Sequence, residues 1–264
     1  MLRIGLLPLT VLATPAIAQG PSREMSTDRP DKTESPYTVD AGRFQIEMDF
    51  ATFTFDDDAN FRVETVTIAP VNFKAGIGRD TDLQLIFDSY VRETATDRTT
   101  GARETIDGFG DVTLRLKHNL WGNDGGATAL ALMPFVKLPT NSGGIGNDAV
   151  EFGIIVPLAI GVSDRVGIGL MTEVDFLREA DGDGLAPSFI NSATIAFGLT
   201  ERLGLYTELF TERSAEDGAR WVVTGDAGLT YAITDDLQVD GGVNLGITDA
   251  ADDFNVFLGI SRRF

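Results

Sequence analysis

The sequence predicts an all-β fold, a transmembrane antiparallel up-and-down β-barrel of about twelve strands, because three features recur together. Apolar and polar residues alternate with a period of two from Arg43 to the end of the chain. The connections between these runs are alternately short turns and longer loops. The polar phase is rich in Gly, Asp, Glu, Asn and Thr, which is typical of strands that face a wet lumen.

The start of the chain has the pattern of a secretory signal peptide. Arg3 precedes an apolar stretch at 4–12, and Ala16-Ile17-Ala18 is a small-x-small cleavage site. The stretch is too short for a membrane-spanning helix, which needs about 20 residues, and the alternative is an ordinary buried helix. We expect three regions, which are a signal peptide at 1–18, an N-terminal periplasmic or luminal segment at 19–42 and a transmembrane barrel at 43–264.

Composition excludes several classes of protein. The chain contains no cysteine, so an exported form needs a large core, a metal or a closed sheet for its stability. Its 40 acidic residues against 21 basic ones repel phosphate backbones, so we expect no nucleic-acid partner. After the leader, no apolar stretch approaches the length of a membrane-spanning helix, so a membrane protein of this sequence would cross as strands.

The alternation defines the expected strands in order. In the run 82–92, the side chains of Leu83, Leu85, Phe87 and Val91 oppose those of Gln84, Asp88 and Arg92. The other clear runs are residues 43–50, 111–120, 150–160, 166–176, 221–233, 237–247 and 254–264.

Two kinds of connection separate the strands. Five are short, at 78–82, 121–126, 162–166, 200–204 and 234–237. Six are longer, at 56–60, 93–108, 139–148, 178–187, 213–219 and 249–253. Their alternation predicts twelve strands with both chain ends on the short-turn side. Residues 43–264 then allow about 18 residues for each strand and its connection, enough for 9–11 membrane residues and a turn.

The apolar phase is expected to face lipid. A soluble sandwich or a lipocalin-like barrel also alternates, so alternation alone does not decide this. The wet composition of the polar phase and the one-sided long loops favour the membrane barrel. Aromatic residues also fall near strand ends, as in interfacial girdles: Phe50, Phe73, Trp121, Trp221, Tyr231 and Phe264.

Several motifs carry a family resemblance. The last strand, "FNVFLGISRRF", ends on Phe264 and resembles the signal by which bacterial outer-membrane proteins are recognised for assembly. "STDRPDKTESPYTVDAGRFQIE", "GFGDVTLRLKHNLWG" and "PFVKLPT" resemble the transporter family named after the meta-pathway of phenol degradation. The resemblance implies an outer-membrane barrel that passively moves small molecules, with hydrophobic or aromatic compounds among them. It implies outer-membrane lipid, lipopolysaccharide and the barrel-assembly machinery as partners.

Charged residues on the polar phase are the candidate lumen and selectivity residues. They are Glu47, Asp49, Asp88, Arg115, Lys117, Glu151, Glu173, Asp175, Asp226 and Asp240, together with Lys74, Arg92, Glu208 and Arg263. One interpretation is that they only pair across strands and keep the interior wet. The other is a narrow pore whose acidic wall favours cations or neutral polar solutes over anions.

The polar stretch "STDRPDKTESP" precedes the first strand and includes the motif Asp28-Arg29-Pro30-Asp31. Prolines forbid regular helix and remove backbone donors, which suits an extended segment inside a barrel. We expect a constriction in which Arg29 and Lys32 pair with Glu47, Asp49 or Asp240, and Asp28 and Asp31 reach Arg263 or Lys74. The alternative is a solvated tether.

Other chemistry has weaker support. The only histidine, His118, lies in phase with lipid-facing leucines, and no serine-containing partner motif is visible, so we expect no catalytic residues. "GGIGND" at 143–148 precedes a strand and is not a phosphate cradle. We expect no cofactor or metal centre. The acidic loops at 56–60, 181–184 and 249–253 leave the binding of divalent ions as an alternative. The alternatives to a channel are a structural or adhesive barrel and a barrel hydrolase that uses His118.

Overall fold

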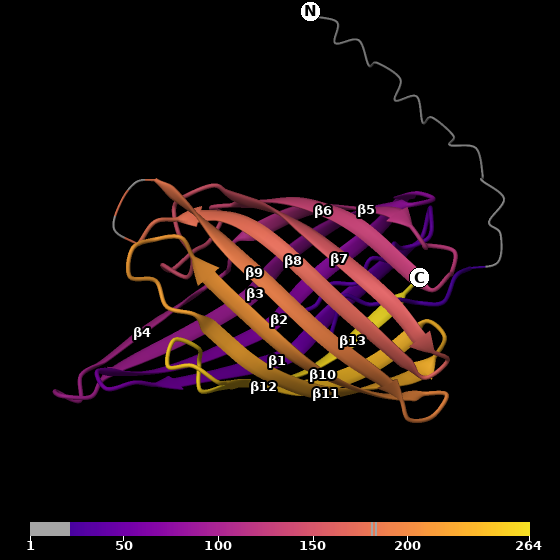
Figure 1. Cartoon of the computed structure of the whole chain (residues 1–264). Coiled ribbons are helices and arrows are strands. Elements are labelled where there is room, and N and C mark those ends of the chain that lie inside the picture. Colours follow the sequence, from indigo (N-terminus) through magenta and orange to yellow (C-terminus); the bar gives the residue numbers. More distant parts are fainter. Residues whose placement is uncertain (1–21, 181, 183) are drawn as a thin grey trace, which may run out of the picture.

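The computed structural model describes residues 22–180, 182 and 184–264, which form one closed β-barrel (Figure 1). The expected signal peptide at 1–18 and the residues Asp181 and Asp183 of the acidic loop lie outside this part. The strands of the described chain are β1 (Phe44–Asp57), β2 (Phe61–Gly78), β3 (Thr81–Asp97), β4 (Arg103–Gly108), β5 (Val112–Trp121), β6 (Thr128–Leu138), β7 (Glu151–Ser163), β8 (Val166–Arg178), β9 (Leu185–Gly198), β10 (Leu203–Ser214), β11 (Val222–Thr234), β12 (Leu237–Gly246) and β13 (Phe254–Arg263).

The barrel wall has twelve strands, because β4 and β5 are two pieces of one. Both pair with β3, β4 along 91–96 and β5 along 81–86, with a break at 109–111. All neighbours are antiparallel, and β1 closes the wall by pairing with both β2 and β13. The predicted fold class and strand number are confirmed.

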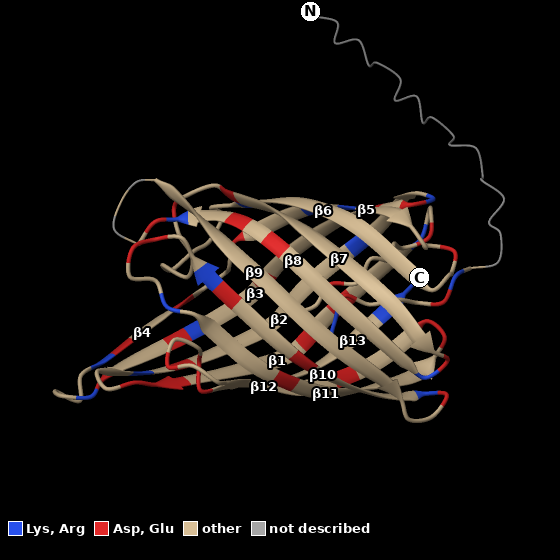
Figure 2. Cartoon of the chain, in the orientation of Figure 1, with Lys and Arg blue, Asp and Glu red and all other residues tan. Residues whose placement is uncertain are grey.

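The two surfaces of the wall differ in chemistry. Phe44, Ile154, Leu245 and Leu258 are among the large apolar side chains exposed on the outside. Most buried polar side chains face the interior, and Figure 2 shows charged residues along the strands as well as at both rims. No helix among the described residues is long and apolar enough to cross a membrane.

One region departs from the expected pattern. Residues 93–108 are not a loop, since β3 runs to Asp97 and returns as β4 in an extended hairpin (Figure 1). Before the hairpin the strands are irregular, with a register shift at Phe50 and a positive φ of 50° at Ala69. These irregularities shift the side-chain phase by one residue.

The phase shift corrects two assignments in β3. Val91, expected on the outside, is buried, whereas Arg92, expected in the lumen, is exposed. Arg92 pairs with Val66, which pairs with Phe53, and these residues share the outer face. A bulge interrupts a strict period of two, so the side-chain orientations predicted from the sequence pattern are wrong beyond the bulge.

The C-terminal residue closes the barrel seam. The Phe264 backbone N–H donates to the Phe44 carbonyl at 2.8 Å, while its ring is 56% exposed. Burial of one such ring contributes at most a few kcal/mol. Deleting Phe264 should therefore leave detergent refolding near normal but reduce the heat-modifiable protein in the outer membrane, because a recognition signal is lost. Phe264→Tyr is the control and should insert normally, and normal insertion of the deletion would refute the assembly role.

Candidate functional site in the barrel lumen

Residues 22–42, called the luminal segment below, run inside the barrel from its short-turn end. They contain no helix or strand, and Thr33, Thr38 and Val39 are buried. Buried backbone groups need partners, and proline-containing extended chain cannot supply them locally. Side chains of the wall therefore provide them, strand by strand around the lumen.

Arg29 joins the luminal segment to two wall carboxylates. Its Nε and Nη2 donate to Asp240 Oδ1 at 3.0 and 2.7 Å, and Nη2 also pairs with Asp49. The guanidinium lies 5.7 Å from the centre of the Phe257 ring. A Cβ at position 259 would lie 2.1 Å from Nη2, so only Gly259 lets the guanidinium sit against the wall. Pro30 follows Arg29 through a cis peptide bond.

Asp28 lies in a buried cluster of alternating charge. Its carboxylate pairs with Lys74 at 2.5 Å and with Lys117, and Lys74 also pairs with Glu47. Both lysine residues are at most 1% exposed. Burial alone would raise the pKa of Asp28, but the two ammonium groups hold that pKa well below its usual value. The Asp28 N–H donates to Glu47 at 3.0 Å, which completes the cluster.

Glu208 on β10 holds the next turn of the luminal segment. Its carboxylate accepts the N–H of Lys32 at 2.9 Å and of Thr33 at 2.7 Å. The Lys32 ammonium lies 3.3 Å from Asp226 Oδ2 and 4.4 Å from the centre of the Phe210 ring. This turn is therefore fixed to the wall opposite the Asp28 cluster.

Further contacts hold the rest of the segment. They are Glu34 with Arg115 at 2.5 Å, the Pro36 carbonyl with Asn119 at 2.8 Å, the Thr38 N–H with Asn123 at 3.0 Å and the Val39 N–H with Asp82 at 3.0 Å.

Asp31 differs from the other acids of the segment's centre. Within the described chain it forms no ion pair. Burial, and next the charge of Glu208, raise the pKa of Asp31 to about 8. The pKa of this carboxyl is therefore set by burial and by a neighbouring acid, and not by a cation of the described chain.

The predicted pairings are partly confirmed. Arg29 pairs with Asp49 and Asp240, and Asp28 pairs with Lys74, as expected. Lys32 does not reach Glu47, Asp49 or Asp240, because the segment has crossed to β10 and β11 by that point.

The Arg263 pairing was wrong. Its guanidinium lies at the short-turn rim, where it donates to Asp236 at 2.7 Å and to the Arg23 carbonyl at 2.8 Å, so neither Asp28 nor Asp31 is its partner.

The structure divides the predicted lumen residues into two groups. Nine of them contact the luminal segment: Glu47, Asp49, Lys74, Arg115, Lys117, Glu208, Asp226, Asp240 and Arg263. Apart from Arg92 on the outer face, the others lie midway along β3 or at the long-loop ends of β7 and β8: Asp88, Glu151, Glu173 and Asp175. Glu151 there pairs with Lys137 of β6.

An apolar arc in the lumen was missed by the sequence pattern. Met133, Ile155, Met171 and Ile190 form a buried cluster on β6–β9, with Phe135 and Phe210 packed against it. The signal was present in the run 150–160, which is apolar on both phases. The lumen therefore has a charged wall and an apolar wall.

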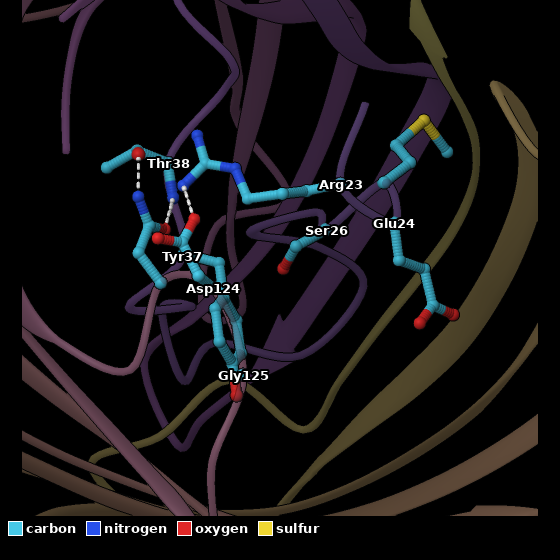
Figure 3. Close-up of a pocket in the computed structure, with 9 residues that line it drawn as sticks. Arg23, Glu24, Ser26, Tyr37, Thr38, Asp124 and Gly125 are labelled. Atoms are coloured by element: carbon cyan, nitrogen blue, oxygen red, sulfur yellow. Dashed lines mark hydrogen bonds and ion pairs between the residues drawn. The ribbon is translucent and has the colours of Figure 1, made fainter. Parts of the chain in front are cut away.

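Among the described residues, cavities border the luminal segment on several sides. The first, about 520 Å³, lies at the short-turn end between Arg23, Tyr37 and Asp124 (Figure 3). The second, about 270 Å³, lies between the segment and β7–β9, and the third, about 180 Å³, lies toward β1–β3. Tyr37 lines the first and second, and Glu34 lines the second and third.

The remaining candidates lie outside this arrangement. His118 is exposed on β5, where its Nδ1 lies 2.9 Å from Thr81 Oγ1. In the part of the chain that the structure describes, no group of three or more acidic or histidine side chains is arranged to hold a metal ion.

Comparison with a family model identifies the chain. Residues 27–264 match the family described as "Putative MetA-pathway of phenol degradation", so the chain belongs to that family. No curated protein sequence matches it.

Solved structures show the same fold at low sequence identity. An outer membrane channel from Pseudomonas putida F1 is 11% identical, with a TM-score of 0.66, over 89% of this chain and 99% of that one. The translocator domain of the autotransporter NalP from Neisseria meningitidis is 12% identical, with a TM-score of 0.53, over 85% and 89%. A deletion mutant of the TodX monoaromatic hydrocarbon channel is 10% identical, with a TM-score of 0.50, over 86% and 91%.

The luminal segment should be held less firmly as pH rises. A released, solvated Asp31 has a pKa near 4, and the bound one has a pKa of about 8, so the bound state holds more protons between these values. Its contribution is complete below about pH 4 and is lost as pH rises toward about 8. The raised pKa of Glu34, caused by burial, acts in the same direction. Asp28 acts oppositely, because its lowered pKa makes its contribution disappear only in acid.

Limited proteolysis of the luminal segment in the folded barrel measures how firmly the segment is held at each pH. Cleavage should accelerate between about pH 5 and pH 8, by at most about tenfold per pH unit for each proton. Asp31→Asn, which resembles the protonated form, should flatten the dependence. A pH dependence of cleavage that is as steep in Asp31→Asn as in the unchanged barrel would contradict the assignment, and the exposed variant Asp164→Asn is the control.

Proposed function

We propose that this family member is a passive outer-membrane channel for small molecules whose lumen is narrowed by residues 22–42. The observation that carries the proposal is the luminal segment, tied across the barrel by Arg29, Asp28 and Lys32. A purely structural barrel could fill its interior with wall side chains alone. A separate segment, held by contacts that can break, suits a passage of adjustable width.

The two walls of the lumen favour small, partly apolar solutes. The arc of Met133, Ile155, Met171 and Ile190 offers apolar contact, and the opposite wall offers carboxylates and ammonium groups. TodX, which shares the fold, is by its name a monoaromatic hydrocarbon channel. We infer hydrophobic or aromatic compounds as candidate solutes here, without a catalytic role for the chain.

The proposal includes a location and partners. The chain is exported through a cleaved signal peptide at 1–18, is inserted by the barrel-assembly machinery and sits among outer-membrane lipid and lipopolysaccharide. A structural or adhesive barrel would share all of these properties but would pass no current. Conductance of the purified protein in planar bilayers therefore separates the two functions.

Loosening the luminal segment should widen the passage. Removing residues 19–36, or changing Arg29→Ala, deletes the pairs with Asp49 and Asp240 and should enlarge or destabilise the open single-channel current. Arg103→Ala, at an exposed position on β4, is the control and should leave the current unchanged. Identical currents with and without residues 19–36 would mean that the segment is only a tether.

Carboxylates of the wall should set ion preference. Glu151, Glu173 and Asp175 lie toward the long-loop end, and Asp226 lies beside Lys32. Changing the four to Gln or Asn together should lower the cation/anion permeability ratio, measured from reversal potentials in a salt gradient. An unchanged ratio with intact conductance would place these side chains outside the conducting path.

A further inference from the structure

The cavity of about 270 Å³ between the luminal segment and β7–β9 has two unlike sides. Its wall side carries some of the smallest residues of the chain, Ala159, Gly161, Gly167, Gly169 and Ala196. A Cβ built on Gly167 would meet nothing closer than a carbonyl oxygen at 4.0 Å. The missing side chain at Gly167 therefore leaves space beside the segment, whereas Gly169 is packed against Thr33 and Thr194.

The segment side of the cavity carries two acids with unmet acceptor capacity. Asp31 forms no ion pair within the described residues, and its hydrogen bonds come from Thr194 and from its own backbone. Glu34 pairs with Arg115 through one oxygen, while its Oε2 is buried without a hydrogen-bond donor. The neighbouring acids Asp28 and Asp40, by contrast, pair with Lys74 and Arg23. A buried carboxylate without a cation is costly, so the Asp31 carboxyl and Glu34 Oε2 are suited to a cation that is supplied from outside the chain.

The cavity shares one lining residue with each of its two neighbours. Tyr37 stands between it and the cavity at the short-turn end, which is lined by the acids Glu24 and Asp124. Glu34 stands between it and the cavity toward β1–β3, which is lined by Glu47 and Asp49. The acids of these two neighbouring cavities have cationic partners, Arg23 for Asp124, Lys74 for Glu47 and Arg29 for Asp49, which Asp31 lacks among the described residues. An aromatic face at Tyr37 adds a second group that attracts cations.

We propose that the cavity beside Asp31 is a binding site for small organic cations, with the ammonium group on Asp31 and Glu34 and the apolar body against the small residues of β7–β9. An ammonium group has three donors and no acceptor, which matches a carboxyl without an ion pair at Asp31 and an oxygen without a donor at Glu34. The apolar wall offers nothing to an inorganic ion but contacts a ring or a short alkyl chain. This inference rests on the proposed channel function, since it names a solute class for the same passage.

Binding can be measured without relying on conduction. Benzylammonium, neutral benzyl alcohol and benzoate would be titrated calorimetrically into the full barrel in detergent at pH 7. Benzylammonium should bind more tightly than the alcohol by roughly tenfold or more, and benzoate should not bind. Because the pKa of Asp31 is raised to about 8, cation binding should release about one proton, seen as a difference between phosphate and Tris buffers.

Two variants with matched controls test the location. Asp31→Asn should remove the proton release and the preference for the cation, whereas Asp164→Asn, the same change on an exposed turn, should not. Gly167→Val should fill the cavity and abolish binding. Gly225→Val adds the same side chain next to Ile247 on the outer face and should bind normally, with folding of each variant checked by heat modifiability.

The outcomes separate this inference from the channel function. Equal binding of amine and alcohol, or binding unaffected by Asp31→Asn and Gly167→Val, would overturn the site, while bilayer conductance of the same preparation would still support a channel. Benzylammonium binding that both variants remove, in a protein that passes no current, would support the site and refute the channel.

Discussion

Burial of charge inside the barrel is the constraint on which the rest of the structure depends. Lys74 and Lys117 are almost fully buried on the wall. Transferring an ion from water to a buried site costs several kcal/mol unless the ion is paired there. Asp28 of the luminal segment is the partner that both share. The wall is therefore not complete without the segment. Losing Asp28 would leave Lys74 paired with Glu47 and would leave Lys117 without an ion pair among the described residues.

The same constraint explains why the segment takes one path. Arg29 needs two carboxylates and a glycine beside them, which β1, β12 and β13 provide through Asp49, Asp240 and Gly259. Lys32 and the backbone that follows it need acceptors on β10 and β11. These two sets of partners lie on consecutive strands of the wall, in the order β1, β13, β12, β11 and β10, so the segment must follow the wall from one set to the next. The space that remains lies against β7–β9, where the wall carries small apolar residues instead of charges.

The sequence predicts much of this architecture for clear physical reasons. A period of two and alternating connection lengths are local properties, so strand number, termini and the lipid face follow from them. The Arg29 pairs were predictable because a buried guanidinium needs carboxylates, and lumen-phase acids were few enough to name. The partner of Lys32 was not predictable, because it depends on the path that the irregular segment takes along the wall between β1 and β10.

Two other features escaped the pattern for different reasons. Bulges near Phe50 and Ala69 shift the phase, so Arg92 moved from the predicted lumen to the outer face. The apolar arc escaped because Ile155 and Met171 lie on the lumen phase, where polar residues were expected. Apolar residues on both phases of 150–160 were the available indication.

A designed disulfide tests the central claim, that the luminal segment is fixed to the far wall in the native barrel. The chain has no cysteine, so the pair Thr33→Cys and Ser192→Cys introduces the only thiols. The two hydroxyl oxygens lie 2.6 Å apart in the structure. We expect rapid, nearly complete cross-linking under mild oxidation in outer membranes, and none for Thr33→Cys paired with Ser163→Cys on the short-turn rim. Failure of the first pair to cross-link in correctly inserted protein would contradict fixation of the segment to the wall.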